Sequence, residues 1–551
     1  MTNHSSKDIL DVAIIGGGVS GVYTGMRLMS SERSELSHLP AEKLKVELFE
    51  QSDRIGGRLL SLEPPGIPTT RVEVGGMRYT SEHKWVLGLV SHFELTPVPF
   101  PVQKPENFAY LRGHRLRIAD LTDASKLPYA LNEYEQSKSE LVDGFTAVAA
   151  KKLLRTITGK DVDLAEVDWL DVAKKYEFEG ANLADLPIRY LMQRMISHEA
   201  YAFAVDSSGY DSILYTWNGA DGFPWNLGDF GASISYYRLA EGYQMIPLKL
   251  CEEFESAGGQ VNREHSMTSF DVVELEDGTR GVELCVEHNG KKTKRFARNL
   301  VLAMPRRSLE LLEPTGKVME PGNQPVRDLI ESVTPIPLFK LAICYSRAWW
   351  EDVPPMESTD ACGNIVMQQI TSGESVTDLP VRQVYYWAKD EVTGKAVVLI
   401  YDDGLALTFW AGLRDQEEMF ENFDNGESKP TEQLSSWTDF PAPKRMVDEA
   451  HRQILEIHGM SGQAEVPAPY AAAFSDWGKD PYGGGANFWH VGVKSHKVSS
   501  DIVQPMKNEP VFICGEAYSH AQGWVEGSLA TTEDMLQHHL GLLPPDWAKD
   551  I

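Results

Sequence analysis

The sequence predicts an α/β fold, and two observations near its N-terminus carry that prediction. A short apolar run, Val12–Ile15, leads directly into three glycines with Gly-x-Gly-x-x-Gly spacing, namely Gly16, Gly18 and Gly21. A segment compatible with a helix, Val22–Met29, follows at once. Strand, glycine turn and helix in this order are the context that a Rossmann-like dinucleotide-binding unit requires.

The three glycines have separate physical tasks in such a turn. Gly16 permits the tight turn, Gly18 lets the backbone approach a pyrophosphate, and Gly21 lets the helix pack against the strand. The phosphates then lie at the positive end of the helix dipole. We expect Val19 and Ser20, between these glycines, to lie beside the bound nucleotide as well.

A second predicted strand, Lys45–Glu50, ends in an acidic residue and is followed by Gln51. An acid at this place accepts hydrogen bonds from the adenosine ribose hydroxyls. Glu50 lies further from Gly21 than the usual spacing of about 20 residues. We therefore expect the polar stretch Ser30–Lys43 to loop out.

A second glycine turn follows this strand, because Gly56 and Gly57 directly precede Arg58. A glycine pair suits a second close approach of the backbone to the pyrophosphate, and Arg58 can donate charge-assisted hydrogen bonds to it. The order of these pieces favours a nucleotide site over an incidental surface turn.

Length and charge exclude several classes of protein. The 551 residues exceed one ordinary hydrophobic core, so we expect two or three domains. The net charge of −28 argues against nucleic-acid binding and against an anionic membrane surface. No apolar run is long enough to cross a bilayer, and the polar first residues lack the apolar core of a signal peptide. We expect a cytoplasmic protein, although a signal removed before residue 1 stays possible.

The cysteines predict neither a metal site nor a disulfide framework. Their number is odd and their spacing is irregular, so we expect reduced thiols and no bound metal. They are Cys251, Cys285, Cys344, Cys362 and Cys514.

Strand and helix signals recur along the whole chain. Apolar residues at three- to four-residue spacing predict helices over Asn132–Leu154 and Leu183–Met195, and a hairpin is expected around Phe108–His114. Further strands are predicted near 261 and at 272–275, 281–286, 299–303, 338–344, 381–387, 397–401 and 510–516, with a last helix at 527–540. Pieces of the nucleotide domain at both ends and in the middle imply that the chain leaves this domain and re-enters it.

The C-terminal segment Gly515–Ser528, which contains Gly515-Glu516 and Gly523-Trp524, completes a set of ordered motifs. With it the chain resembles the flavin amine oxidase family, and within that family the L-amino acid oxidases. The resemblance runs from about residue 11 to 540 and is strongest over 11–29, 46–79, 335–350, 377–401 and 510–532.

The resemblance implies a Rossmann-like FAD-binding domain of the glutathione-reductase type, a mixed-sheet substrate domain and a helical insertion. The expected FAD-binding domain comprises 1–80, 236–325 and 500–551. The substrate domain comprises 81–122 and 326–499, and the helical lobe comprises 123–235.

The cofactor implied by the resemblance is FAD. Gly515 and Glu516 would approach its ribityl–phosphate end, and Trp524 would lie beside the isoalloxazine ring. A helix beginning near Val525 would place a positive dipole end near the flavin. The full set expected to contact FAD is Gly16, Gly18, Val19, Ser20, Gly21, Glu50, Gln51, Gly57, Arg58, Gly75, Gly76, Met77, Arg78, Met267, Trp477, Gly515, Glu516, Gly523, Trp524 and Val525.

Two residues are implied to hold a substrate carboxylate. Glu73–Tyr79 matches the family segment whose arginine, here Arg78, clamps the carboxylate, and a planar guanidinium presents two parallel donors to such a group. Tyr401, at the end of an apolar strand, matches the position whose phenol donates a second hydrogen bond.

Lys340 is a single lysine within the otherwise apolar strand Leu338–Cys344. A lysine there is rarely buried without a partner or a function. In the family this lysine holds a water molecule beside flavin N5, and the resemblance implies the same role for Lys340.

The remaining site residues rest on the resemblance alone. Tyr385 matches the second wall of an aromatic cage that faces Trp524. Trp477, Asn487 and Gly523 match the wall beside the substrate, and Asn487 stands where a relative has an aliphatic residue.

The implied reaction is oxidative deamination of an L-amino acid. Hydride transfer from Cα to flavin N5 gives an imino acid, which water converts to a 2-oxo acid and ammonia, and O2 is reduced to hydrogen peroxide. A flavin amino acid 2-monooxygenase and an amine or polyamine oxidase stay open as alternatives. The expected partners are the substrate and O2, with assembly into a homodimer or a higher homo-oligomer.

Overall fold

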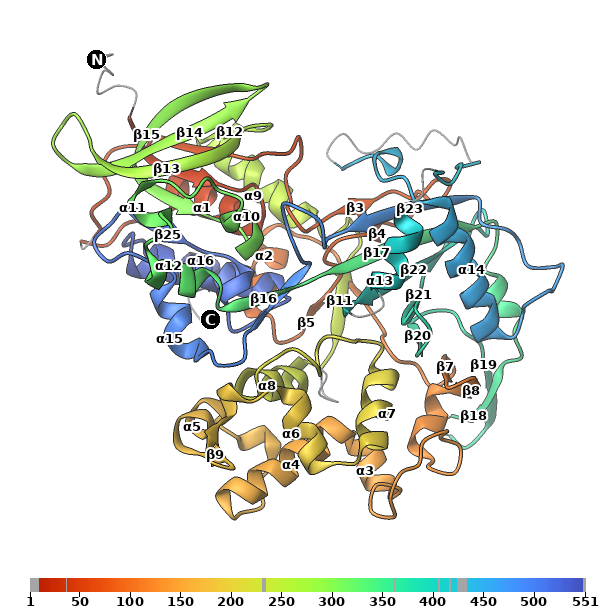
Figure 1. The fold of residues 1–551 in the computed structure, drawn as a ribbon. Helices are drawn as coiled ribbons and strands as arrows, with labels where there is room; N and C mark the ends of the chain where they lie inside the picture. The colour runs from red at the N-terminus through yellow and green to blue at the C-terminus, as the bar shows by residue number, and fades with distance from the viewer. Residues whose placement is uncertain are drawn as a thin grey trace.

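A computed structural model describes residues 9–35, 37–229, 234–360, 362–404, 407–415, 418–423 and 434–548. Two large sheets lie side by side, and a lobe of helices lies below them in the view of Figure 1. This architecture confirms the predicted α/β class.

The first sheet gathers strands from three distant parts of the chain. Its order is β12-β2-β1-β15-β14-β13. Strand β25 pairs with the last residues of β15, Leu300–Leu302, beyond the part of β15 that pairs with β14. The strands β12, β2, β1, β15 and β25 are parallel, whereas β13 and β14 form an antiparallel extension. The bounds are β1 Ile9–Ile15, β2 Val46–Phe49, β12 Gln260–Asn262, β13 Ser266–Glu274, β14 Arg280–His288, β15 Lys291–Leu302 and β25 Val511–Ile513. The predicted return of the chain to this sheet is therefore confirmed.

Three helices pack together on this sheet: α1 (Val19–Ser30), α9 (Met245–Ser256) and α16 (Val525–His538). Helix α1 is buried over Val19–Leu28, so it is enclosed on all sides. A Cβ atom at Gly25 of α1 would lie 2.9 Å from the ring of Phe254 in α9. The glycine therefore permits the close approach of these two helices.

The second sheet has the order β23-β17-β22-β21-β20-β7-β8. Its central strands β17 and β22 are almost completely buried, because helices α13 and α14 pack on one face and a cavity described below lies on the other. In their antiparallel register Lys340 lies opposite Tyr401. The bounds are β7 Phe108–Leu111, β8 His114–Arg117, β17 Leu338–Tyr345, β20 Glu374–Thr377, β21 Gln383–Lys389, β22 Ala396–Asp403, β23 Ala471–Asp476, α13 Leu407–Arg414 and α14 Lys444–His458.

The helical lobe corrects two sequence predictions. The single helix predicted over Asn132–Leu154 is wrong, since two helices, α3 (Lys138–Asp143) and α4 (Phe145–Thr158), meet at Gly144 with φ of 80°. The helix predicted from Leu183 begins only after Pro187, because proline disfavours a helical conformation in the residue before it. The other lobe helices are α5 Trp169–Lys175, α6 Ile188–Met195, α7 His198–Ser208 and α8 Gly219–Asp229.

Shorter elements join these parts. They are β3 Ser61–Leu62, β4 Val72–Glu73, β5 Tyr79–Thr80, β6 Pro97–Pro99, β9 Glu177–Phe178, β10 Ala181–Asn182, β11 Tyr236–Leu239, β16 Val333–Ile336, β18 Met356–Thr359, β19 Ile365–Gln368, β24 Ala486–Trp489, α2 Lys84–His92, α10 Arg306–Glu310, α11 Gly316–Met319, α12 Gln324–Ile330 and α15 Ser495–Asp501. Among the described residues no helix has the length and apolarity that a membrane span needs. The domain boundaries given above stay a proposal.

A buried ion pair joins the two ends of the chain within the first domain. Arg27 of α1 donates to both carboxylate oxygens of Glu533 in α16, at 2.6 and 3.0 Å, and Tyr23 donates to the same carboxylate at 2.7 Å. The Arg27 and Glu533 side chains are 2% and 1% exposed. Removing one partner would leave an uncompensated charge in the core.

We predict that Glu533→Ala lowers the free energy of unfolding by about 3–5 kcal/mol, the usual loss when a buried pair is broken. A urea titration followed by circular dichroism measures it. The matched control is Asp448→Ala, which breaks an exposed pair with Lys444 and should change stability by less than about 0.5 kcal/mol. Equal stability of the two variants would contradict a structural role for the buried pair.

Candidate functional site

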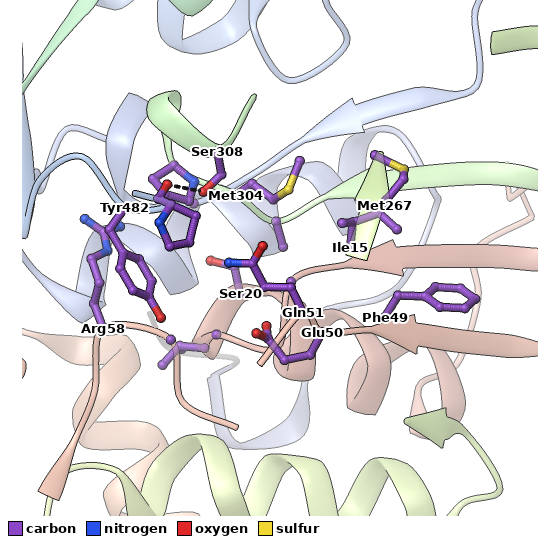
Figure 2. Close-up of a pocket in the computed structure, with 18 of the residues that line it drawn as sticks. Ile15, Ser20, Phe49, Glu50, Gln51, Arg58, Met267, Met304, Ser308 and Tyr482 are labelled. Atoms are coloured by element: carbon purple, nitrogen blue, oxygen red, sulfur yellow. Dashed lines mark hydrogen bonds between the residues drawn. The ribbon is translucent and has the colours of Figure 1, made fainter. Parts of the chain in front are cut away.

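A long cavity of about 460 Å3 opens at the carboxyl ends of the parallel strands. Its walls include Ile15, Phe49 and Ala303, which end or follow β1, β2 and β15. Figure 2 shows Phe49 and Met267 at one end of this long cavity and Arg58 and Tyr482 at the other. The carboxyl edge of a parallel sheet is where α/β proteins bind nucleotides.

The glycine turn at this edge leaves no room for side chains. A Cβ atom at Gly21 would lie 1.8 Å from the carbonyl oxygen of Gly16. Gly16 itself has φ of 108°, a conformation that favours glycine. The second glycine turn lies against the first, because the Gly56 N–H donates to the Gly17 carbonyl at 2.9 Å. Both predicted close approaches of the backbone therefore meet at one place.

Glu50 lies in the wall of the long cavity, where its carboxylate is already anchored. One oxygen accepts the Gly17 N–H at 2.6 Å, and the other accepts the N–H and the hydroxyl of Ser52 at 2.8 and 2.7 Å. These bonds fix the carboxylate beside the glycine turn. Its contact with a ribose stays a prediction.

Most of the expected cofactor residues line the long cavity. They are Gly16, Gly18, Val19, Ser20, Glu50, Gln51, Gly57, Arg58, Gly76, Met267, Gly515, Glu516, Gly523, Trp524 and Val525. Gly21 lies within the strand–helix turn, and Gly75, Met77, Arg78 and Trp477 line a second cavity next to the first.

Glu516 lines the long cavity as expected for a cofactor contact, and its carboxylate also joins three segments. It accepts Arg58 at 2.8 Å, the Gly523 N–H at 2.7 Å, and both the backbone and side-chain N–H of Asn487 at 2.9 and 3.0 Å. Arg58 also donates to the Gly485 carbonyl at 2.9 Å. Asn487 thus supports Glu516 and does not line the second cavity, where it was expected to meet the substrate.

The second cavity, called the inner cavity here, has a volume of about 120 Å3. It adjoins the long cavity, since both are lined by Arg58, Gly76, Gly485, Gly523, Trp524 and Val525. Trp477 forms part of its wall and donates its indole N–H to the Val74 carbonyl at 2.7 Å.

Arg78 brings a buried positive charge to the inner cavity. The residue is 5% exposed, and its guanidinium donates to the hydroxyls of Tyr385 at 3.3 Å and Tyr210 at 3.2 Å. The guanidinium carbon lies 4.7 Å from the centre of the Tyr236 ring. No carboxylate oxygen of the described residues lies within ion-pair distance of it. Its hydrogen-bond partners are therefore neutral, and the buried carboxylate of Glu374 acts on its charge only from beyond ion-pair distance.

Lys340 also lines the inner cavity, where its ammonium donates to the Gly75 carbonyl and lies 5.0 Å from the centre of the Tyr401 ring. Burial lowers the pKa of Lys340 to about 7, Glu73 opposes that shift, and Arg78 adds to it. Burial likewise raises the pKa of Glu73 to about 7 against its hydrogen bonds with Ser61 and Tyr243. Lys340 is thus a buried amine that can change its protonation state near neutral pH.

The tyrosines of the site differ from the expectation. Tyr401 lines the inner cavity, as does Trp524, whereas Tyr385 lies behind Arg78 and donates to Gln383 at 2.7 Å. In the sheet register Gln383 pairs with Tyr401, so Tyr385 is displaced along the strand by two residues. The ring of His83 contacts Trp524, at 4.7 Å between centroids.

Sequence reasoning missed several residues of the inner cavity: Tyr210, Ser212, Ile213, Asp403 and Phe488. Asp403 could have been found, because it lies two positions after Tyr401 and so shares its face of β22. Tyr210 had no local signal, since it comes from the turn after α7 in the helical lobe.

Comparison with known proteins identifies the family. The sequence pattern of a family described as "Flavin containing amine oxidoreductase" matches residues 35–532. Aplysianin-A of Aplysia kurodai is 25% identical over 97% of this chain and 90% of its own length. L-amino-acid oxidase 4 of Hebeloma cylindrosporum is 21% identical over 97% of this chain and 82% of its own length.

The fold agrees with these relatives. The structure of cyclohexylamine oxidase from Brevibacterium oxydans superposes with a TM-score of 0.62 at 17% identity, covering 96% of this chain and 99% of that one. Together the comparisons confirm the predicted family, its FAD cofactor and an oxidoreductase of the amine oxidase kind. The crowded glycine turn and the long cavity beside it fit such a cofactor.

We predict that Gly21→Ala weakens FAD binding, because the added methyl group would have to displace the Gly16 carbonyl from the turn. Overpacking of this kind costs about 1–3 kcal/mol, a five- to 150-fold loss of affinity. Flavin absorbance after desalting measures the bound FAD. Gly322→Ala is the control, since no atom lies within 4 Å of its added Cβ. Full flavin content in Gly21→Ala would contradict the position of FAD at this turn.

Proposed function

The chain belongs to the family of flavin containing amine oxidoreductases, and we propose that within it this protein is an L-amino-acid oxidase. The proposed reaction converts an L-amino acid, water and O2 into a 2-oxo acid, ammonia and hydrogen peroxide. Relatives named L-amino-acid oxidase support this choice, and the environment of Arg78 carries it.

The observation that carries this proposal is that the buried guanidinium of Arg78 forms no ion pair with a carboxylate of the described residues. Burying an unpaired charge is strongly unfavourable, so such groups are normally paired. Among the described residues Arg78 has only phenol hydroxyls as hydrogen-bond partners, and it lies in the wall of a small cavity. A substrate carboxylate is the group that would complete this environment. A simple amine substrate would leave the charge unpaired.

The tyrosines beside Arg78 extend this carboxylate site. Tyr401 and Tyr210 both line the inner cavity, with ring centroids 5.5 Å apart. Each phenol can donate one hydrogen bond to a carboxylate oxygen that Arg78 does not occupy. This set fixes one end of the substrate and so directs its Cα toward the side where the inner and long cavities meet.

The rest of the wall positions the amine end of the substrate and excludes bulk water. Trp524 and Trp477 supply apolar surface, which favours a neutral amine over an ammonium. FAD, when bound, accepts the hydride of Cα and delivers both electrons to O2. Lys340 can hold a water molecule or a proton at its Nζ in the wall of the inner cavity. Orientation of the substrate by these residues supplies much of the catalysis.

Two alternatives in the same family make different demands on this site. A flavin amino acid 2-monooxygenase would use the same carboxylate clamp, and a low yield of hydrogen peroxide would identify it. An amine or polyamine oxidase would not need Arg78. A peroxide assay with the proteinogenic L-amino acids, their D-enantiomers and the corresponding decarboxylated amines separates all three.

We predict that Arg78→Ala lowers kcat/KM for L-amino acids by roughly thirtyfold or more, because losing a buried charged partner costs about 2–5 kcal/mol. The preference for L-phenylalanine over 2-phenylethylamine should collapse in the same variant. Steady-state peroxide assays on protein with measured FAD content give both numbers.

Tyr401→Phe serves as the graded comparison, with a smaller loss, since one neutral hydrogen bond contributes about 0.5–1.5 kcal/mol. An Arg78→Ala enzyme that still prefers amino acids over amines would place the carboxylate site elsewhere.

A second prediction concerns pH. Below about pH 7 the buried Lys340 carries its proton, and above it the amine is neutral. We expect the reaction of reduced enzyme with O2 to slow as the pH rises through this value. Lys340→Met should be slower by roughly a hundredfold on the acid side, the usual effect of removing one electrostatic donor, and independent of pH there. Stopped-flow absorbance after anaerobic reduction measures the rate.

Glu73 is a second group that titrates in this pH range, because burial raises its pKa to about 7. The Lys340→Met variant separates the two groups. A pH dependence that persists in Lys340→Met would assign the titration to Glu73 and contradict the role of Lys340. The cytoplasmic location and the homo-oligomeric state stay predictions.

A further inference from the structure

A third cavity, called the outer cavity here, lies where the helical lobe meets the C-terminal segments. Its volume is about 790 Å3, within the usual range of about 300–1,000 Å3 for ligand sites. Helices α5 and α8 form one side, and α15 with His520 and Ala521 forms the other. Figure 1 labels α5, α8 and α15 on the same side of the molecule.

Aromatic rings separate the outer cavity from the inner one. Among their described lining residues the two cavities share Trp225 alone. Trp217, which lines the outer cavity, stacks on Phe488, which lines the inner one, at 3.7 Å between centroids. Trp225 lies 4.9 Å from Trp217. The outer cavity is therefore a separate compartment, and its properties can be considered independently of the amine oxidase reaction.

Indole rings give the outer cavity a flat apolar wall. Trp169 and Trp225 are half-buried and present ring surface to it, whereas Trp217 and Trp489, which also line it, are each only 1% exposed. Trp169 is held against Phe223, with ring planes only 12° apart, and Trp217 is held by the stack on Phe488. Such fixed ring faces favour a planar aromatic ligand, since aromatic pairs contribute about 0.5–1.5 kcal/mol beyond their buried area.

The rim of the outer cavity is positively charged. Lys174, Lys494 and Lys497 line it from two different helical segments, together with His496 and His520. The three lysines are exposed, and no carboxylate of the described residues lies within 4 Å of any of them. Unpaired lysines that converge on one cavity are unexpected in a chain with 80 acidic and 52 basic residues. Their charges converge on one cavity and so attract an anion from outside the chain.

The acidic residue of this cavity does not neutralise the rim. Asp221 already accepts the hydroxyl of Ser495 at 2.7 Å and the amide of Asn218 at 2.8 Å, and burial raises its pKa. Burial lowers the pKa of His496, and the charges of Lys174 and Lys497 lower it further. These two lysines therefore act on the same imidazole. Charge and apolar surface therefore meet within one compartment.

We propose that the outer cavity is a second ligand site, which binds small planar aromatic acids. The ring of the ligand lies against the indoles, and its anionic group lies among Lys174, Lys494 and Lys497. This site goes beyond the oxidase reaction and does not depend on it.

The test uses FAD-loaded protein in an Arg78→Ala background, which removes the only buried arginine that could capture an acid in the inner cavity among the described residues. Isothermal titration with indole-3-acetate should show one site per chain, with an affinity that falls as salt is added. Indole-3-acetamide, which has the same ring without the charge, and inorganic phosphate, which has charge without a ring, should each bind at least about tenfold more weakly.

Charge reversal locates the site. Lys174→Glu/Lys494→Glu/Lys497→Glu should weaken indole-3-acetate binding at least about tenfold. The matched control, Lys138→Glu/Lys160→Glu/Lys507→Glu, changes the net charge equally at exposed lysines away from the cavity and should bind as the parent does. No binding by the parent, equal binding of the acetamide or of phosphate, or equal losses in the two triple variants would each overturn the proposal. Peroxide assays on the same triple variants with Arg78 restored test the oxidase reaction separately.

Discussion

The carboxylate of Glu516 is the contact on which the site depends. It joins the glycine turn through Arg58, strand β24 through Asn487, and the loop before α16 through Gly523. Arg58 lies more than 400 positions before the other segments in the chain, yet all of them border both the long and the inner cavity. Because one buried carboxylate accepts four hydrogen bonds, its geometry fixes where the cofactor cavity ends and the substrate cavity begins.

Three buried cations illustrate how the fold distributes charge. Arg27 has a carboxylate partner in Glu533 and contributes to stability. Lys340 has no carboxylate within hydrogen-bond distance, and burial lowers its pKa toward neutrality. Arg78 stays charged among phenols. Arg27 is thus paired within the chain, whereas Arg78 and Lys340 form no ion pair among the described residues, which is what the proposed function expects of groups that meet a ligand.

The features that the sequence predicted are those set by residues close together in the chain. The glycine turn, Glu50 and the apolar strand around Lys340 each depend on a few neighbouring residues, and the structure brings them to one edge of one sheet and the facing wall. Periodicity alone missed the break at Gly144, because a glycine with positive φ ends a helix without disturbing the apolar spacing. The contact of Tyr385 with Arg78 could not be predicted, because the register between β21 and β22 cannot be read from either strand by itself.

The helical lobe contributes Tyr210 to the inner cavity. This was the least predictable feature, because it depends on a contact between residues far apart in the sequence. Asp403, at the end of β22, accepts the backbone N–H of Asp211 at 2.8 Å and also the hydroxyl of Ser212. These bonds fix the turn that carries Tyr210, whose hydroxyl contacts Arg78. Burial raises the pKa of Asp403 to about 6, so its carboxylate is ionised above that pH and accepts these donors fully. The second sheet thus contacts the lobe through an acid, and the lobe in turn supplies Tyr210 to the wall of the inner cavity.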